Sequence, residues 1–150
     1  MKIFTIGYQG LNLKAFMAWL NRYNIDIVAD VRRRPQSRKK GFSKNGLRET
    51  LGENEIDYIG YPSLGPSKED RDELYKTGDY EKFFRKYLSF LDDQDQQQQI
   101  DELYGLVEKG KRIALLCFEH DPETCHRTVL ARQIKKRSKN GFKIQHLEPF

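Results

Sequence analysis

The chain has 150 residues, a length that favours a single domain, because two independent cores of roughly 75 residues each would bury little apolar surface. With 37% hydrophobic, 12% aromatic and 33% charged residues, wholesale disorder is excluded. No stretch approaches the roughly 18 apolar residues of a membrane span, and residues 1–7 indicate a strand rather than a secretory signal. We therefore expect one cytoplasmic domain over residues 1–150, with no membrane contact.

The net charge of +5 is unevenly distributed along the chain. Residues 1–48 carry 11 Lys or Arg and 2 Asp or Glu, residues 49–102 carry 6 and 15, and residues 103–150 carry 10 and 5. Such a partition favours one basic and one acidic face, which suits an anionic partner. The alternative is an ordinary soluble surface.

The first 31 residues predict a strand, a helix and a second strand. Residues 3–7 are an apolar run that ends in a glycine-containing turn, and apolar residues then recur at helical spacing over 11–23. Residues 25–31 form a second β-rich run. The crossover of such a βαβ unit makes its two strands parallel.

The middle of the chain predicts further helices and one strand. A short helix is expected over residues 43–51, with Ser43 as its N-cap, and a strand over 56–59. Residues 61–67 predict a surface loop. A helix is then expected from about residue 79, where aromatic residues recur at helical spacing. A second helix is expected over residues 100–107, and the polar tract 92–99 before it is expected to be its solvated start.

The most hydrophobic run, residues 112–118, predicts a central parallel strand that is covered on both faces. A helix from about 125 to 137 and a strand over 142–147 follow it. The expected fold class is α/β, a single-domain, mostly parallel Rossmann-like sheet of about five strands with helices on both faces.

Ligands of open parallel sheets bind beyond the carboxyl ends of the strands. One such end carries Gly7, Tyr8 and Gly10, and we expect Gly7 and Tyr8 to contact a ligand there. The two glycines lack the third glycine and the spacing of a dinucleotide fingerprint, so no nicotinamide or flavin cofactor is indicated. A tight turn is the favoured role for both glycines.

The second strand end opens a basic segment, residues 32–48, which holds eight Lys or Arg and no acid. Arginine forks match phosphate geometry, and an aromatic ring among the charges could stack on a base. The candidate phosphate ligands here are Arg32 and Arg34, and the candidate nucleic-acid contacts are Arg33, Arg38, Lys39, Lys40 and Phe42. Solvated surface charge is the alternative.

Asp30 and Glu119 both follow apolar strands. Two carboxylates at adjacent strand ends can hold Mg²⁺ or share general acid and base work, although they can equally orient arginines. Apart from this possible magnesium ion, no cofactor is expected.

The third strand end leads to Cys125, His126 and Arg127 at a predicted helix start, where free N–H groups and the helix dipole favour anions. Cys125 at that position would have a lowered pKa, as a nucleophile needs. A phosphatase loop requires Arg six positions after the Cys, and the chain has Ala131 there, which disfavours that class. Cys117 and Cys125 match no common zinc spacing and no disulfide framework, so we expect both to be free thiols without zinc.

These segments resemble the family catalogued as domain of unknown function (DUF) 488. The resemblance rests on residues 5–8, on Ala29-Asp30-Val31-Arg32 with Pro35, Ser37 and Phe42, on Tyr58 with Leu64-Gly65, and on Leu116-Cys117-Phe118-Glu119 with Cys125-His126-Arg127. It implies a compact α/β fold and a site at those positions, and it carries no settled reaction.

The sequence therefore predicts a polar site that binds or processes a phosphorylated ligand, with nucleic acid or a nucleotide first. In an enzymatic version, a hydrolase or transferase, Arg32, Arg34 and Arg127 hold phosphate, Asp30 or Glu119 acts as base or metal ligand, and His126 acts as acid. In a binding version the arginines and Phe42 clamp a nucleic-acid backbone without turnover. A third version is a protein-interaction adaptor that uses the acidic middle segment. We expect the side chains of five residues to converge on one pocket: Asp30, Arg32, Glu119, His126 and Arg127.

Overall fold

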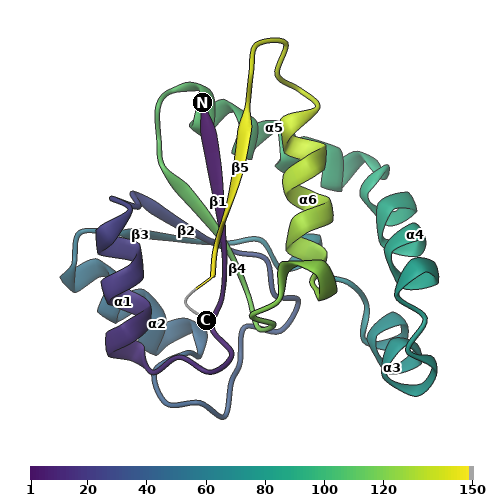
Figure 1. The fold of residues 1–150 in the computed structure, drawn as a ribbon, viewed down its shortest axis with the longest axis horizontal. Coiled ribbons are helices and arrows are strands. Elements are labelled where there is room, and N and C mark those ends of the chain that lie inside the picture. The colour runs from purple at the N-terminus through teal and green to yellow at the C-terminus, as the bar shows by residue number, and fades with distance from the viewer. Residues whose placement is uncertain (149–150) are drawn as a thin grey trace.

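Five parallel strands form the centre of the computed structural model, which describes residues 1–148 (Figure 1). The sheet has the order β3-β2-β4-β1-β5. Its strands are β1 (Lys2–Gly7), β2 (Ile27–Asp30), β3 (Asp57–Gly60), β4 (Ile113–Cys117) and β5 (Lys143–Leu147). The predicted α/β class and the five-stranded parallel sheet are confirmed.

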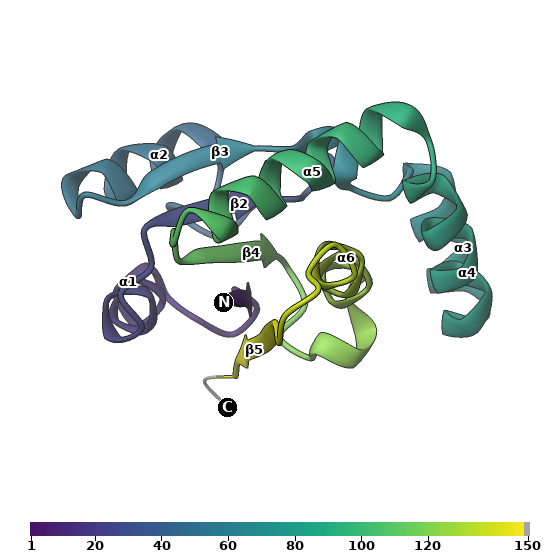
Figure 2. The same cartoon turned by 90° about the horizontal axis from the view of Figure 1, so that it is seen from above.

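Helices cover both faces of the sheet, as predicted (Figure 2). One face packs against α1 (Leu13–Arg22) and α2 (Lys44–Glu53). The other packs against α4 (Tyr80–Leu91), α5 (Gln94–Glu108) and α6 (His126–Lys135).

The central position of β4 explains its continuous apolar sequence. Successive side chains of a strand point to opposite faces, and all five residues of β4 are buried. Ile113 and Leu115 belong to the core under α4, α5 and α6, whereas Ala114 and Leu116 belong to the core under α1 and α2. The two cores together hold the carboxyl ends of β1, β2 and β4 side by side.

The helix α3 (Lys68–Thr77) was not predicted. Seven of its ten residues are charged, so it shows almost no apolar periodicity. It pairs with α4 at one end of the molecule (Figures 1 and 2), and Glu73 forms ion pairs with Lys82 and Lys86. The sequence marks this helix only at its two ends, by Ser67 before it and Gly78 after it. In the structure the Ser67 side chain accepts a hydrogen bond from the Asp70 N–H, and Gly78 ends the helix in the left-handed conformation.

The polar tract begins α5, as predicted, but it is not wholly solvated. Gln96 is buried, and its Nε2 donates to the Ser63 carbonyl at 3.2 Å in the short 3₁₀ turn Pro62–Leu64. Within residues 1–148, no helix has the length and apolar character needed to cross a membrane.

Candidate functional site

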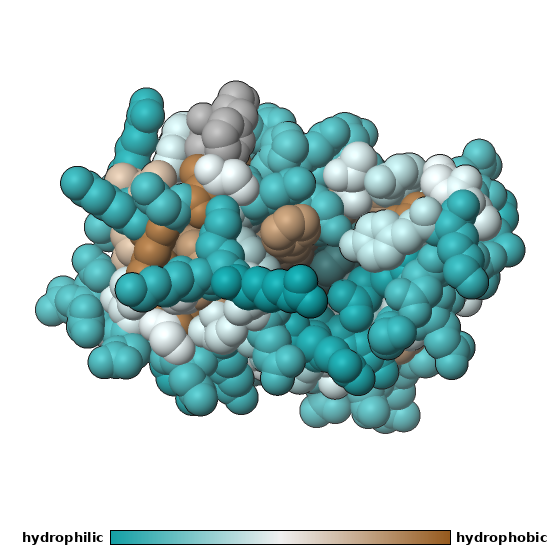
Figure 3. All heavy atoms as spheres, turned by 90° about the horizontal axis from the view of Figure 1, so that it is seen from below, coloured by the Kyte–Doolittle hydropathy of each residue, from teal (hydrophilic) through white to brown (hydrophobic). Residues whose placement is uncertain are grey.

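A cavity of about 230 Å³ lies at the carboxyl edge of the sheet. Figure 3 views this side of the molecule, a largely hydrophilic surface with a small apolar group near its middle. The strand-end segments line the cavity with Tyr8, Arg32, Arg33, Arg34, Cys117, Phe118, Glu119 and His126, and α3 and α4 add Arg71, Leu74, Tyr75 and Phe83. The position agrees with the general rule for ligand sites in open parallel sheets.

Arg32 forms a buried ion pair with Asp30 just beyond the end of β2. Its Nε donates to Asp30 Oδ1 at 2.8 Å and one terminal nitrogen donates to Oδ2 at 2.7 Å, while the other donates to the Phe42 carbonyl at 2.7 Å. Tyr58 on β3 donates to Asp30 Oδ2 at 2.6 Å. Burial lowers the pKa of Arg32, but the hydrogen bond and the charge of Asp30 outweigh it and raise the pKa.

Both oxygens of Asp30 are therefore engaged, and its side chain does not line the cavity. A magnesium ion would have to displace Arg32 or Tyr58 to bind it. This geometry corresponds to the alternative in which the carboxylate orients an arginine.

Phe42 is fully buried, so the prediction that it stacks on a base is wrong. Its ring stacks on Tyr8 with centroids 4.7 Å apart and packs edge-on against Phe16. An aromatic residue between charges favours a surface ring, and the sequence does not show that this segment folds back onto Tyr8 and Phe16. Phe42 instead fixes the Tyr8 ring at the cavity wall.

The other residues of the basic segment divide into two groups. Lys39 is half-buried, and its Nζ donates to the carbonyls of Tyr8 and Leu11, so it ties the segment to the end of β1. The exposed basic residues are Arg33, Arg34, Arg38, Lys40, Lys44 and Arg48. These exposed residues can offer most of their charge to a partner.

Gly7 allows the loop after β4 to approach β1. A Cβ atom added to Gly7 would lie 1.7 Å from the Glu119 carbonyl oxygen and 2.4 Å from its carbon, both backbone atoms. Gly7 does not line the cavity, so its contribution is this close approach, whereas Gly10, with φ of 82°, makes the expected turn.

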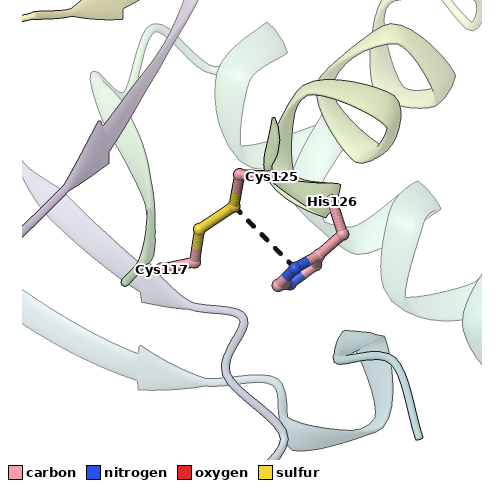
Figure 4. A group of neighbouring side chains, drawn as sticks. All are labelled: Cys117, Cys125 and His126. Atoms are coloured by element: carbon pink, nitrogen blue, oxygen red, sulfur yellow. Dashed lines mark hydrogen bonds between the residues drawn. A yellow bond between two sulfur atoms is a disulfide. The ribbon is translucent and has the colours of Figure 1, made fainter. Parts of the chain in front are cut away.

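Cys117 and Cys125 form a disulfide, so the prediction of two free thiols is wrong (Figure 4). Cys117 is the last residue of β4 and Cys125 is the N-cap of α6. The seven residues between them include the 3₁₀ turn Pro122–Thr124, which folds the chain back. Sequence separation alone did not reveal that the two sulfurs meet. In this form, Cys125 is not the free nucleophile that was predicted.

His126 is buried beside this disulfide. Its Nε2 lies 2.9 Å from the Val31 carbonyl and must donate to it, so the neutral ring turns the Nδ1 lone pair towards Cys125 Sγ, 3.9 Å away (Figure 4). Burial lowers the pKa of His126 to about 4. The predicted role as an acid does not fit a ring that is neutral at pH 7 and donates its only N–H to the backbone.

Arg127 lies directly behind the cavity and is fully buried. One terminal nitrogen donates to Cys117 Sγ at 3.2 Å and to the Glu119 carbonyl, and the other donates to the His120 carbonyl. Its Nε has no hydrogen-bond partner. Burial lowers the pKa of Arg127 to about 10.

Glu119 is the carboxyl group that lines the cavity. Its Oε2 lies 3.6 Å from Cys117 Sγ, and burial raises its pKa above the usual value. Among residues 1–148, the group of potential metal ligands with mutually close donor atoms comprises Cys117, Cys125 and His126, and the disulfide occupies both sulfurs. Glu119 and Asp30 do not form such a group.

Three of the five residues expected to converge, Arg32, Glu119 and His126, line the cavity. Asp30 and Arg127 lie behind it, each bonded to a lining residue. The chemical roles expected for Asp30, Arg32, Glu119 and Arg127 stay predictions.

The prediction missed the contribution of α3, which brings Arg71 and Tyr75 to the cavity. The Arg71 Nε is buried without a hydrogen-bond partner.

The fold and the cavity define a Rossmann-like α/β protein with an arginine-rich pocket at its strand ends. The family model described as domain of unknown function DUF488 matches residues 12–134, most of the chain, and the protein belongs to this family. Comparison with curated proteins and with solved structures found no match.

Proposed function

We propose that the cavity binds a small phosphorylated ligand. The observation that carries this proposal is the charge of the lining, since Arg32, Arg33, Arg34 and Arg71 face a single carboxyl group, Glu119. An excess of guanidinium groups over a recess favours an anion, and arginine forks match the tetrahedral oxygens of phosphate.

The donors for the phosphoryl group are Arg33, Arg34 and Arg71. Arg32 lines the cavity but is not proposed as a donor to the ligand, because most of its N–H groups already donate to Asp30, Tyr8 and the Phe42 carbonyl. Arg71 offers a buried Nε that lacks a partner. A buried polar atom without a partner costs free energy, which a bound anion would recover.

The volume of about 230 Å³ favours a small ligand, because pockets for drug-sized molecules usually measure about 300 to 1,000 Å³. A phosphate group with a short organic part fits this size better than a whole dinucleotide. In a hydrolase or transferase, Glu119 would be the general acid or base, because it is the carboxyl group at the cavity wall.

Calorimetric titration tests the proposal with inorganic phosphate and glycerol phosphate at low ionic strength. Replacing Arg71 with Gln should weaken binding by about tenfold or more, because a charge-assisted hydrogen bond is worth about 1.5–3 kcal/mol. The matched control is Arg85→Gln, an exposed arginine of α4 that does not line the cavity, and it should leave affinity unchanged. Absence of binding in the unaltered protein, or equal losses in both variants, would reject the proposal.

A second candidate, binding of a nucleic-acid backbone, has its own supporting observation. A wider groove of about 640 Å³ is lined by Arg33, Arg34 and Lys44 and shares the two arginines with the cavity. Basic residues along such a groove would bind the phosphates of a nucleic-acid backbone without sequence-specific contacts to the bases.

Salt dependence tests this second candidate. If about four basic groups touch phosphates of duplex DNA, the log–log slope of affinity against salt should be about −3.6. Replacing Arg34 and Lys44, which line the groove, together with Ala should reduce that magnitude by up to about 2, whereas Glu119→Gln should not. Affinity that ignores salt would exclude this candidate and leave the small ligand.

A further inference from the structure

We infer that Cys117 and Cys125 form a redox-active dithiol–disulfide pair in which Cys117 is the cavity-facing sulfur and, once reduced, the thiolate that pairs with Arg127. The inference goes beyond ligand binding, and three independent features of the strand end support it.

The first feature is the environment of Arg127. Its side chain is fully buried and its Nε lacks a partner. Within residues 1–148, no carboxylate forms an ion pair with it. The charges of Glu119, Asp121 and Glu148 act on Arg127 without direct contact, and burial still lowers its pKa. A buried cation without a contacting counterion is costly. Its terminal nitrogen lies 3.2 Å from Cys117 Sγ, so reduction to a Cys117 thiolate would supply a counterion in direct contact.

The second feature is the environment of Cys125. This residue is the N-cap of α6, where free backbone N–H groups stabilise a negative sulfur. The Nδ1 lone pair of His126 lies 3.9 Å from its Sγ and can accept a hydrogen bond from the Cys125 thiol when the pair is reduced (Figure 4). Each sulfur thus has its own group to stabilise the reduced form.

The third feature is access. Cys117 lines the cavity, whereas Cys125 does not, although both have an exposed fraction of only 1%. A small thiol in the cavity therefore meets Cys117 first. The arginines around the cavity favour a thiol that carries a negative charge.

The reaction balances with two equivalents of a small thiol as reductant. The first thiolate attacks Cys117 Sγ, the bond between the two cysteine sulfurs breaks, and Cys125 leaves with the electron pair and takes up a proton from solvent. The second thiolate attacks the sulfur of the first thiol in the mixed disulfide and releases Cys117 as a thiolate beside Arg127. The two small thiols leave as one disulfide, so the protein gains the two electrons that they lose.

The first test is reduction of the native, full-length chain by dithiothreitol at about 1 mM, followed by trapping of thiols and mass spectrometry. We expect two thiols per chain with an unchanged circular dichroism spectrum, and diamide should restore the disulfide. Reduction only in denaturant, or reduction that unfolds the protein, would make the disulfide structural and overturn the inference. Two thiols that diamide cannot join would also overturn it, as would stoichiometric zinc bound by the reduced protein.

The second test assigns the two sulfurs. Cys125→Ser leaves Cys117, which should react with iodoacetate about tenfold or more faster than the Cys125 that remains in Cys117→Ser. The pH midpoint of Cys117 alkylation should lie below the ordinary thiol pKa of about 8.5. Arg127→Gln should raise this midpoint, while Arg127→Lys, which keeps the charge, should raise it less. An ordinary midpoint for Cys117 would refute the assignment.

These outcomes are separable from those of the proposed function. Thiol counts need no anion, and phosphate titration needs no change in the disulfide. A protein that binds phosphate but cannot be reduced while folded would reject only the redox inference.

Discussion

Replacing Asp30 with Asn tests whether the buried ion pair with Arg32 holds the strand ends together. The Asp30 carboxylate accepts four hydrogen bonds, two on each oxygen, from the Arg32 backbone N–H, from two guanidinium nitrogens and from Tyr58. Asn keeps one acceptor oxygen but removes the charge, so a buried guanidinium loses its counterion. Breaking a buried pair in this way costs about 3–5 kcal/mol, and the retained oxygen places the expected loss near 3 kcal/mol.

Urea unfolding followed by circular dichroism measures this loss, and thermal unfolding should show a decrease of about 6–12 °C for a chain of this length. The matched control is Asp72→Asn, since Asp72 pairs with Lys68 on the exposed surface of α3 and should have little effect. If the Asp30 variant were as stable as the Asp72 variant, the ion pair would not stabilise this edge of the sheet.

Two further changes probe the same edge. Gly7→Ala should destabilise the protein by about 3 kcal/mol or more in urea unfolding, because the new Cβ meets the Glu119 backbone, whereas Gly105→Ala in α5 meets nothing and should stabilise it by about 0.5–1 kcal/mol. Equal effects would contradict the close approach. Because burial lowers the His126 pKa to about 4, the unfolded chain binds a proton that the folded chain does not. The free energy of unfolding should therefore fall by about 3 kcal/mol from this residue as pH drops from about 6.5 to 4. His126→Gln should lack that component, and identical pH profiles of the two proteins would refute it.

The sheet could be predicted because each buried strand carries a dense apolar run. Residues 113–117 need apolar side chains on both faces, and the βαβ opening fixes parallel strands. The position of the cavity followed from the same rule, since parallel strands bring their carboxyl ends to one edge. Strand order was not accessible, because it depends on which crossovers pack best in three dimensions.

The details of the site could not be predicted, because they depend on tertiary contacts. Phe42 is buried by a return of its segment that charge patterning does not signal. The disulfide requires a tight fold of the loop between Cys117 and Cys125. Arg71 reaches the cavity from a helix whose charged sequence lacks periodicity. In each case a contact formed only in the folded chain decided the environment of a residue that local patterns had left open.

The most direct test of the anion-binding account is a crystal structure of the protein with tungstate, a phosphate analogue that gives a strong anomalous signal. The account predicts one dominant anomalous peak in the cavity, within hydrogen-bond distance of guanidinium groups of Arg33, Arg34 or Arg71. In crystals of Arg71→Gln this peak should weaken or disappear. An empty cavity at saturating tungstate, or peaks confined to the exposed Arg38 and Lys40, would contradict the central claim.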